Sequence, residues 1–484
     1  MLPPPLVVGF DLDMTLFDTR PGIAAVWREL SAVTGVVVDV DLAVSRLGPP
    51  LAVEMANWVP PEEVDHFVAA YLALYADIAI QTSVLMPGAV EALTAVAHLG
   101  GQAVLVTAKH AAHARRHLEH AGLDIATVVG DLWGEGKATA LRKSGAAVYV
   151  GDHVLDVAGA RAAGAVSVGV ATGPCSADEL RGAGADVVLT DLHELQAWLE
   201  EYVLEQRLAA LLRGLGSLES LLVAFSGGAD SAFLLAAAVR ALGPRRVVAA
   251  TALSGSLPVA ELEAARAFAH DLGVRHLTPA THEQDRDGYR SNGGDRCWFC
   301  KAELLDVLTP LATAHGLAGV ATGTNADDAR AGFRPGIRAA AERDAVTPLL
   351  DAGLSKAQVR EVSRRWGLVT WDKPAAACLA SRIAYGVEVT PARLSRVERA
   401  ELALRQALAS HEVRVEQLRV RDLGGRARVE LDGAATDAVI SDAAAQTAAL
   451  RAVRETGFEE VHLDLAGFRS GSMNELLTRP EQYR

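Results

Sequence analysis

The chain has 484 residues, half of them hydrophobic, and a formal net charge of −14. A chain of this length exceeds one hydrophobic core and favours roughly three domains. Residues 1–200 hold 24 acidic and 11 basic residues, which argues against nucleic-acid binding by that half, whereas residues 201–484 are nearly neutral. The four cysteines are too few for a disulfide framework, no apolar run reaches membrane-spanning length and no leader peptide is visible, so we expect a cytoplasmic protein.

The first 200 residues alternate short apolar strands with Ala- and Leu-rich helical stretches. The expected strands cover residues 6–13, 103–107, 147–152, 166–172 and 186–190. This alternation is typical of a doubly wound parallel sheet, whose reactive groups gather where the strands end. Long helical patterns over 19–85 interrupt it and predict an inserted cap. We therefore expect an α/β domain over 1–200, followed by a linker helix over 201–215.

The second half repeats the same pattern and then changes. The strands expected there cover residues 221–225, 247–253 and 319–324. They predict a second parallel-sheet α/β domain over 216–388. After residue 388 a strand, a Gly-Gly turn and a second strand precede an Ala-rich helix and the strand VHLDL. This order predicts a small α+β domain over 389–484.

Two carboxylates stand two residues apart at the end of the first strand, Asp11 and Asp13 in FDLDMT. Side chains at i and i+2 of an extended backbone share one face, so both can reach one centre. The later strand ends carry further polar residues, namely Thr107, Lys137, and Asp152 with Asp156 in GDHVLD. We expect Asp11, Asp13 and Asp152 at a Mg²⁺ site, with Asp11 attacking phosphorus and Asp13 as general acid and base. Thr107 and Lys137 would hold phosphoryl oxygens.

In this order, these motifs resemble the haloacid dehalogenase superfamily, specifically its phosphoglycolate-phosphatase-like branch with a helical cap. The resemblance covers about residues 1–195 and implies a Mg²⁺-dependent phosphatase of Rossmann-like fold. Caps of this kind set the choice of substrate. Pyrophosphate and an organic phosphomonoester both stay open as substrates here.

A glycine-rich loop, SGGADS, follows the strand LLVAF and opens an apolar helix. Its residues Ser226, Gly227, Gly228, Asp230 and Ser231 are expected to bind the pyrophosphate end of ATP. Glycines let the backbone approach phosphate closely, and backbone N–H groups at a helix start attract anions. The loop lacks the Gly-Lys-Ser/Thr ending of γ-phosphate-transferring enzymes. It has the form of the PP-loop, typical of enzymes that cleave ATP to AMP and pyrophosphate.

Four longer motifs narrow this class. They are RCWFCKAEL (296–304), GTNADDARAGFRPG (323–336), WDKPAAACLASRIAYG (371–386) and LDLAGFRSGSMNE (463–475). Together they resemble the LarE family of ATP-dependent sulfur transferases, over about residues 216–484. The resemblance implies conversion of pyridinium-3,5-biscarboxylic acid mononucleotide to its thiocarboxylates, for the nickel-pincer nucleotide of lactate racemase. It also implies other enzymes of that cofactor's biosynthesis as partners, and a homo-oligomer.

The same resemblance assigns residues. Cys378 matches the sulfur-donating cysteine, and the expected substrate pocket consists of Trp298, Ser381, Arg382, Arg419, Arg421 and Asp464. Some members of the family sacrifice the sulfur of one cysteine. Others hold a [4Fe–4S] cluster on three, which here would be Cys297, Cys300 and Cys378, and transfer a sulfide from its open iron. A zinc site and packed reduced thiols are the competing interpretations of the CxxC pair.

Two other functions remain open for the second half. A PP-loop tRNA thiolase would act on RNA, but no RNA-binding module is recognisable. A small-molecule adenylating ligase or amidotransferase would need an ammonia source, and no glutaminase domain is evident. Lys301, beside Cys300, is expected to be a solvated helix residue.

Overall fold

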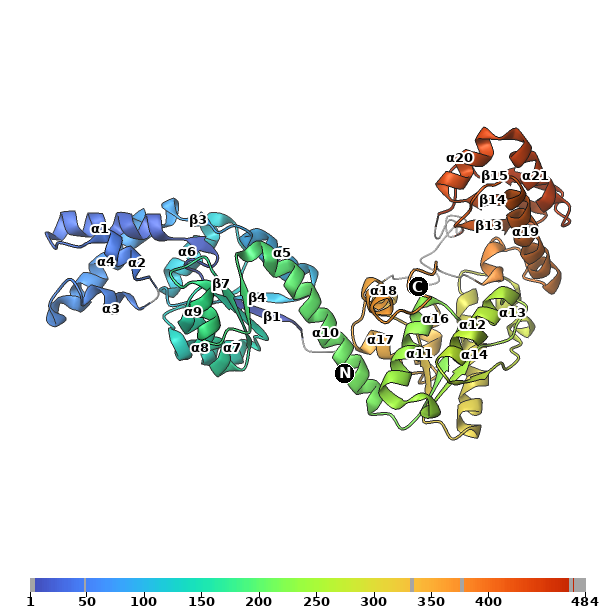
Figure 1. Ribbon diagram of the computed structural model, residues 1–484, viewed down its shortest axis with the longest axis horizontal. Helices are drawn as coiled ribbons and strands as arrows, with labels where there is room; N and C mark the ends of the chain where they lie inside the picture. The colour runs from blue at the N-terminus through green and yellow to red at the C-terminus, as the bar shows by residue number, and fades with distance from the viewer. Residues whose placement is uncertain (1–4, 48, 331–334, 375–377, 470–472, 474–484) are drawn as a thin grey trace. The chain divides into compact units, whose positions relative to one another are not determined.

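The structure is a computed structural model that describes residues 5–47, 49–330, 335–374, 378–469 and 473. The described residues form two compact units, and the boundary between them falls between Glu205 and Gln206, inside helix α10 (Leu195–Gly216). Each unit is described by itself below (Figure 1).

The first unit is built on a six-stranded sheet in the order β5-β4-β1-β6-β7-β8, in which every paired strand is parallel. Its strands are β1 (Val7–Phe10), β4 (Gln102–Val106), β5 (Thr127–Val129), β6 (Val148–Gly151), β7 (Val166–Val170) and β8 (Val187–Leu189). The helices that accompany them are α5 (Ala89–His98), α6 (Ala111–Ala121), η3 (Gly134–Gly136), α7 (Lys137–Ser144), α8 (Val154–Ala163), α9 (Ala177–Gly182) and η4 (Leu192–Glu194).

Strand β1 lies in the middle of this sheet because both of its faces are apolar. Val8 and Phe10 pack into one core with residues of α5, α6 and α10. Val7 points to the other face and packs against Tyr149 and residues of α7 and α8. A strand buried on both sides reads as a continuous apolar run, VVGF, rather than as an alternating one. Its carboxyl end is therefore the buried centre of the sheet edge that carries Asp11.

Residues between two short strands form the cap. β2 (Phe17–Asp18) pairs antiparallel with β3 (Val84–Leu85). The helical cap is inserted between these two strands, so it begins after β2 and ends before β3. The cap has a core of its own, which includes Trp27, Tyr71 and Tyr75. Its helices are α1 (Arg20–Thr34), α2 (Val40–Ser45), α3 (Leu51–Met55), η1 (Pro61–Glu63), α4 (Val64–Ile78) and η2 (Ile80–Thr82).

The second unit contains a parallel sheet in the order β11-β10-β9-β12 and a three-stranded sheet in the order β13-β14-β15. The strands are β9 (Leu221–Ala224), β10 (Val247–Ala250), β11 (Arg275–Leu277), β12 (Val320–Thr322), β13 (Leu418–Asp422), β14 (Arg426–Leu431) and β15 (Glu460–Leu463). β13 and β14 form the predicted antiparallel pair across Gly424 and Gly425, and β15 joins β14 in parallel.

The helices of the second unit flank these sheets. They are α11 (Ala229–Leu242), η5 (Pro244–Arg246), α12 (Val259–Asp271), η6 (Glu283–Asp285), α13 (Asp287–Arg290), α14 (Arg296–Ala314), α15 (Ala326–Arg330), α16 (Pro335–Ala341), α17 (Pro348–Asp351), α18 (Lys356–Arg365), η7 (Leu379–Arg382), α19 (Pro391–Ser410), α20 (Gly433–Ser441) and α21 (Ala443–Arg454).

The α/β class is as predicted, and the differences concern short elements. β5 and β11 have three residues each and lie at sheet edges, where a strand needs little apolar sequence of its own. The single Ala-rich helix expected near residue 440 is two helices, because Asp442 ends α20 and caps α21 by accepting from Ala444 N and Ala445 N.

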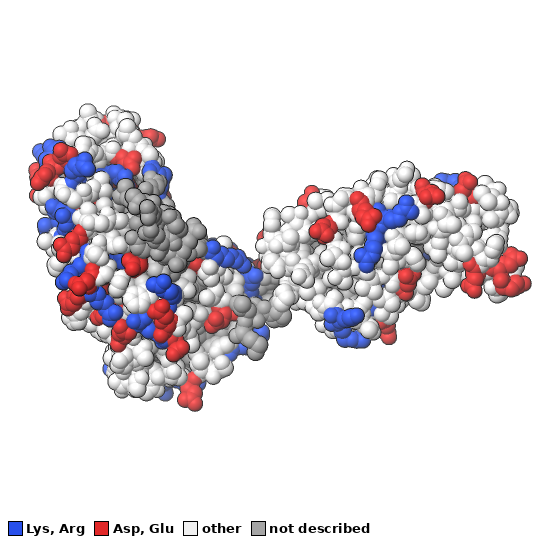
Figure 2. Space-filling view, turned by 180° about the vertical axis from the view of Figure 1, so that it is seen from behind, with Lys and Arg blue, Asp and Glu red and all other residues white. Residues whose placement is uncertain are grey.

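The surface is mixed in charge. Figure 2 shows Lys and Arg interspersed with Asp and Glu over the second unit on the face drawn, and acidic side chains at the cap end of the first unit. Within the described part of the chain, no helix combines the length and apolarity needed to cross a membrane.

Candidate functional sites

Three carboxylates meet at the carboxyl edge of the first sheet. Asp11 follows β1, whereas Asp152 and Asp156 follow β6, and these neighbouring strands bring oxygen atoms of all three within 4.8 Å of one another. All three side chains are buried. Asp156 stands at the first turn of α8, where its carboxylate also accepts from His153 N and completes a capping box. The sequence predicted Asp13 as the third metal ligand beside Asp11 and Asp152. In the structure the third carboxylate of this group is Asp156 instead.

Lys137 balances part of this negative charge. Its Nζ lies 3.0 Å from Asp11 Oδ1, 2.6 Å from Asp156 Oδ1 and 2.8 Å from the hydroxyl of Tyr149. Tyr149 donates in turn to Val106 O at 2.6 Å. The lysine opens helix α7, so its side chain starts from a rigid element. Lys137, which the sequence predicted to hold phosphoryl oxygens, is thus buried, and its ammonium group contacts Asp11, Asp156 and Tyr149.

The electrostatics of the carboxylates favour a divalent cation. Burial raises the pKa of Asp11 to about 6, Lys137 opposes that rise, and Asp156 and Asp13 add to it. Burial also raises the pKa of Asp152 well above its usual range, with Asp156 and Asp11 contributing. Hard oxygen ligands crowded together without enough positive charge are the donor set that Mg²⁺ prefers. The residues present therefore fit the Mg²⁺ ion that the haloacid dehalogenase resemblance implies.

Two glycines lie against these carboxylates, and their lack of a side chain provides the space that the carboxylates occupy. A Cβ added at Gly173 would stand 1.8 Å from Asp152 Oδ2, and one added at Gly151 would stand 2.5 Å from Asp156 Cβ. Thr15 donates to Asp152 Oδ1 at 3.0 Å. The backbone at Gly173 thus lies so close to the Asp152 carboxylate that only glycine fits at this position.

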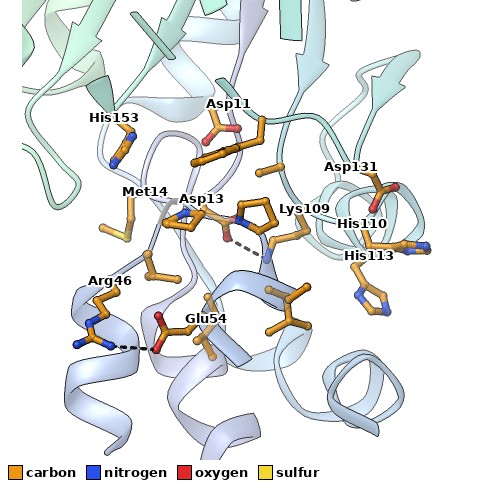
Figure 3. A pocket seen from close by; sticks show the side chains of 18 of the residues that line it. Asp11, Asp13, Met14, Arg46, Glu54, Lys109, His110, His113, Asp131 and His153 are labelled. Carbon is orange, nitrogen blue, oxygen red and sulfur yellow. Dashed lines mark ion pairs between the residues drawn. The ribbon is translucent and has the colours of Figure 1, made fainter. Parts of the chain in front are cut away.

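Asp13 has different partners. Its Oδ1 accepts from Thr19 Oγ1 at 2.5 Å and lies 3.0 Å from Lys109 Nζ. Lys109 also donates to the hydroxyl of Tyr75 in cap helix α4, at 2.6 Å. Figure 3 shows Asp13 and Lys109 pointing toward each other among the residues that line a cavity. Lys109 was not predicted, and the signal for it was its position two residues after Thr107 at the end of β4.

That cavity has a volume of about 330 Å³ and extends from the carboxylates into the cap. Its inner end includes Asp11, Asp13 and Lys137, and its outer end includes Arg46 and Glu54 (Figure 3). Thr107 is fully buried beside it, and its Oγ1 accepts from Lys109 N at 3.3 Å. Of the residues predicted for phosphoryl chemistry, Asp11, Asp13, Lys137 and Asp152 line this cavity, and Thr107 does not.

The glycine-rich loop of the second unit lies where predicted, between β9 and α11. Gly227 has a φ of +72°, a left-handed conformation that favours glycine, and Gly228 is the residue that precedes α11. Ser226 N donates to Ser231 Oγ at 3.3 Å, and Ser231 Oγ donates to Gly228 O at 3.1 Å. These bonds hold the loop in a tight curve at the helix N-terminus, a shape suited to an anion.

A second predicted motif touches this loop. Asn325 of GTNADD donates from Nδ2 to Asp230 Oδ1 at 3.2 Å, and its Oδ1 accepts from the backbone N–H groups of Asp327 and Asp328. Lys373, from the third motif, donates to Gly227 O at 2.9 Å and pairs with Glu261. Parts of those two motifs, residues 331–334 and 375–377, lie outside the described residues, as do 470–472 and 474–475 of the fourth.

The structure makes neighbours of the three cysteines. Cys297 and Cys300 stand one helical turn apart in α14, and Cys378 directly precedes η7. Burial raises the pKa of Cys300, and the charges of Cys378, Glu283 and Cys297 raise it further. Cys300 and Cys378 also pack against the same apolar core. Lys301 is not the solvated residue that was expected, because it is partly buried and burial lowers its pKa.

Three of the predicted arginines cluster beside Cys378. Arg382 Nη1 donates to Cys378 O at 3.1 Å, and Arg421 Nη1 donates to Ser381 O at 3.2 Å. Burial, with the charge of Arg382, lowers the pKa of Arg419 to about 10. Ser381 Oγ donates to Cys378 O at 2.7 Å. Arg382 and Arg421 are buried and pair with Glu401 at 3.0 Å and with Glu430 at 2.7 Å, so guanidinium groups and carboxylates lie together beside Cys378.

Asp464 and Trp298 have other surroundings. Asp464 lies 3.7 Å from Nε of Arg428, a residue that the sequence did not single out. Arg428 and Arg421 both form ion pairs with Glu430. Trp298 donates to Glu342 at 3.1 Å, and the guanidinium of Arg343 lies 5.3 Å from its ring centre. Asp464 therefore belongs to the arginine network, whereas Trp298 packs against arginine and glutamate side chains around α16.

The first unit has the fold of an α/β hydrolase, and the sequence profile of the haloacid dehalogenase-like hydrolases matches residues 8–170. Solved structures similar to this part include a haloacid dehalogenase-like protein of Streptococcus pneumoniae (20% identity, TM-score 0.38, 40% of this chain and 98% of that one). A hydrolase of Pseudomonas syringae is another (24% identity, TM-score 0.36, 40% of this chain and 98% of that one).

Two curated relatives match more than half of the chain. An uncharacterized protein of Synechocystis sp. is 41% identical over 277 residues, which are 57% of this chain and all of that protein. The pyridinium-3,5-bisthiocarboxylic acid mononucleotide synthase of Lactiplantibacillus plantarum is 32% identical over 274 residues, 56% of this chain and 95% of that enzyme. The chain thus joins an N-terminal haloacid dehalogenase-like hydrolase to a C-terminal region that belongs to the LarE sulfur transferase family.

Proposed function

We propose that the second unit is an ATP-dependent sulfur transferase that acts on pyridinium-3,5-biscarboxylic acid mononucleotide, and that the first is a Mg²⁺-dependent phosphatase. The sulfur transfer is supported by the relationship to the synthase of L. plantarum and by Arg421, which comes from β13 and donates to the carbonyl oxygen of Ser381, three residues after Cys378. The buried group of Asp11, Asp152, Asp156 and Lys137 carries the phosphatase.

The sulfur transfer needs an activated carboxylate. A substrate carboxylate attacks the α-phosphorus of ATP, the α–β bond breaks and pyrophosphate leaves, while the loop at Ser226–Ser231 holds the departing phosphates. Sulfide then displaces AMP from the adenylate and leaves a thiocarboxylate. Arg382, Arg419 and Arg421 bind the anionic mononucleotide next to the sulfur donor.

We propose that Cys297, Cys300 and Cys378 hold a [4Fe–4S] cluster. Three thiolates would leave one iron open for a sulfide, and the packing of Cys300 and Cys378 against one core, with Cys297 one turn from Cys300, supports this arrangement. In the other mode, Cys378 gives up its own sulfur and becomes dehydroalanine, so that each chain acts once.

In the phosphatase, Asp11 attacks phosphorus and the ester bond breaks as Asp13 protonates the leaving oxygen. Asp13 then takes a proton from water, which attacks the aspartyl phosphate and releases phosphate. Lys137 holds Asp11 and Asp156 in place and balances charge that develops on the phosphoryl oxygens. A bound Mg²⁺, held by Asp11, Asp152 and Asp156, would lower the repulsion between the nucleophile and its anionic substrate.

Anaerobic incubation with ATP, the biscarboxylate nucleotide and sulfide tests the first activity. Mass spectrometry should find thiocarboxylate, AMP and pyrophosphate; ATP cleavage without any thiocarboxylate would reject the sulfur transfer. Thiolated nucleosides in tRNA, formed in a parallel reaction, would establish the tRNA thiolase instead, and amide formation with ammonia would establish the ligase. For the second activity, Mg²⁺-dependent release of phosphate should disappear in Asp11→Asn, while ATP cleavage by the second unit persists.

Three further expectations stay proposals. The protein would act beside other enzymes of nickel-pincer nucleotide biosynthesis, it would form homo-oligomers, and it would work in the cytoplasm. Pull-down from a cell extract and light scattering test the first two.

A further inference from the structure

The cavity of the first unit is larger than a phosphate group alone requires. Its volume of about 330 Å³ reaches from Asp11 and Asp13 to Arg46 and Glu54 in the cap (Figure 3). Pockets for small organic molecules begin at about 300 Å³. Inorganic pyrophosphate or phosphoglycolate would occupy the inner end and leave the outer end unfilled.

The outer end is lined by apolar and aromatic side chains. Trp27, Leu51, Val68, Tyr71 and Leu72 line this part of the cavity, and the rings of Trp27 and Tyr71 lie 4.9 Å apart between centroids. Trp27 and Tyr71 are almost fully buried, so Leu51, Val68 and Leu72 supply the apolar surface that gains free energy when an organic group covers it. A small, fully charged phosphate compound cannot make use of it.

A single carboxylate interrupts the apolar lining. Glu54 is 9% exposed, its Oε1 accepts from Trp58 Nε1 at 2.8 Å and its Oε2 accepts from Asn57 Nδ2 at 3.3 Å. Its cationic neighbour is the exposed Arg46, at 3.8 Å. The lysines of the cavity, Lys109 and Lys137, both lie at the phosphoryl end. The outer end therefore holds one buried carboxylate beside one exposed guanidinium, and the oxygens of Glu54 can accept hydrogen bonds from amide or amino groups of a ligand.

We propose that this phosphatase acts on nucleoside monophosphates whose planar base is neutral or cationic, and that pyrophosphate and phosphoglycolate are poor substrates. The proposal rests on the phosphatase activity proposed above and names its substrate class. The phosphate would lie at Asp11, with the base against the partly exposed Leu51, Val68 and Leu72 and its polar edge at Glu54. The carboxylate of Glu54 favours a cationic ring, such as a pyridinium.

The test compares two nucleotides that differ in one group, using the full chain with Mg²⁺. Nicotinamide mononucleotide carries an amide where nicotinic acid mononucleotide carries a carboxylate. We expect kcat/KM for the amide to exceed the values for the acid, pyrophosphate and phosphoglycolate by at least about tenfold. In Glu54→Gln, which removes the charge and keeps the acceptor for Trp58, the preference for the amide over the acid should shrink severalfold.

Blocking the outer end supplies a second measurement. Ala52 lines the cavity and is exposed, so Ala52→Trp fills space without disturbing a core. It should lower kcat/KM for nicotinamide mononucleotide by about tenfold more than for phosphoglycolate. The control is Val53→Trp, at the adjacent exposed position, which should leave the nucleotide reaction unchanged.

Two results would overturn the substrate class: faster hydrolysis of pyrophosphate or phosphoglycolate than of the nucleotides, or an equal loss of both reactions in Ala52→Trp. Calorimetric binding of nicotinamide mononucleotide to Asp11→Asn separates recognition from turnover. Nucleotide binding without hydrolysis by the wild type would reject the phosphatase and keep the substrate class. Hydrolysis of small phosphates without nucleotide binding would do the reverse, and the absence of both would reject both.

Discussion

The ammonium group of Lys109 lies 3.0 Å from Oδ1 of Asp13. The same lysine donates to Tyr75 in the cap, and Tyr75 is bonded to His117 at 2.9 Å. The proposed general acid is thus tied through Lys109 to the helix that covers the cavity. This relationship gives the first of four predictions.

Lys109→Met should lower the kcat of the phosphatase by about tenfold to a hundredfold, because Asp13 loses the cation that orients its carboxylate. Phosphate release under saturating substrate measures this. Lys109→Arg keeps the charge and should retain most of the activity. An unchanged kcat in Lys109→Met would mean that the ion pair has no part in the reaction.

Gly173→Ala should weaken Mg²⁺ binding, since the new Cβ would lie 1.8 Å from Asp152 Oδ2 and must displace that carboxylate. We expect the Mg²⁺ concentration for half-maximal activity to rise by about tenfold or more. Titration of phosphate release with Mg²⁺ gives this value. Gly182→Ala is the matched control, because no atom lies within 4 Å of a Cβ added there. Equal Mg²⁺ dependence in the two variants would contradict the prediction.

His117 should make the first unit less stable in acid. Burial, with the nearby charge of Lys109, lowers its pKa to about 3, from an ordinary value of 6.5. The imidazole stays neutral in the folded state, but it gains a proton on unfolding when the pH is below 6.5. The free energy of unfolding is therefore highest at neutral pH and decreases as the pH falls from 6.5 toward 3. Between pH 7 and pH 5 the loss is about 2 kcal/mol.

Calorimetry of the full chain at pH 7 and pH 5 tests this stability change. The drop in Tm of the transition that belongs to the first unit should be smaller in His117→Gln than in the wild type. His120→Gln, an exposed position of the same helix, should behave like the wild type. A His117→Gln protein with the wild-type drop would show that another group dominates the acid response.

Single cysteine variants distinguish the two sulfur sources. If a cluster is used, Cys297→Ser, Cys300→Ser and Cys378→Ser should each lose iron, visible absorbance and thiocarboxylate formation, because a cluster bound by three thiolates tolerates no loss of one. The wild type should hold about four irons. If Cys378 is sacrificed, Cys297→Ser should still complete one turnover, and the mass of the spent chain should fall by the elements of hydrogen sulfide.

The strand-end residues could be found in the sequence because each follows a recognisable apolar run. Asp11, Asp152 and the loop beginning at Ser226 are examples, and parallel strands must bring such ends to one edge of a sheet. Lys109, Glu54 and Arg428 could not be found in this way. Their roles depend on contacts between segments far apart in the chain, and no local pattern distinguishes them from surface charges.

The amino-acid order by itself determined that the chain joins two α/β units, one with aspartates at its strand ends and one with a glycine-rich loop and three cysteines. That information is local, because strand, turn and helix signals extend over a few residues. Only the tertiary structure decided that Asp156 joins Asp11 and Asp152, that Lys109 joins Asp13 to the cap, and that one cavity extends from the nucleophile to Glu54 in the cap. Those features arise where the cap helices pack over the edge of the sheet, and such packing depends on the shapes and charges of residues distant in sequence.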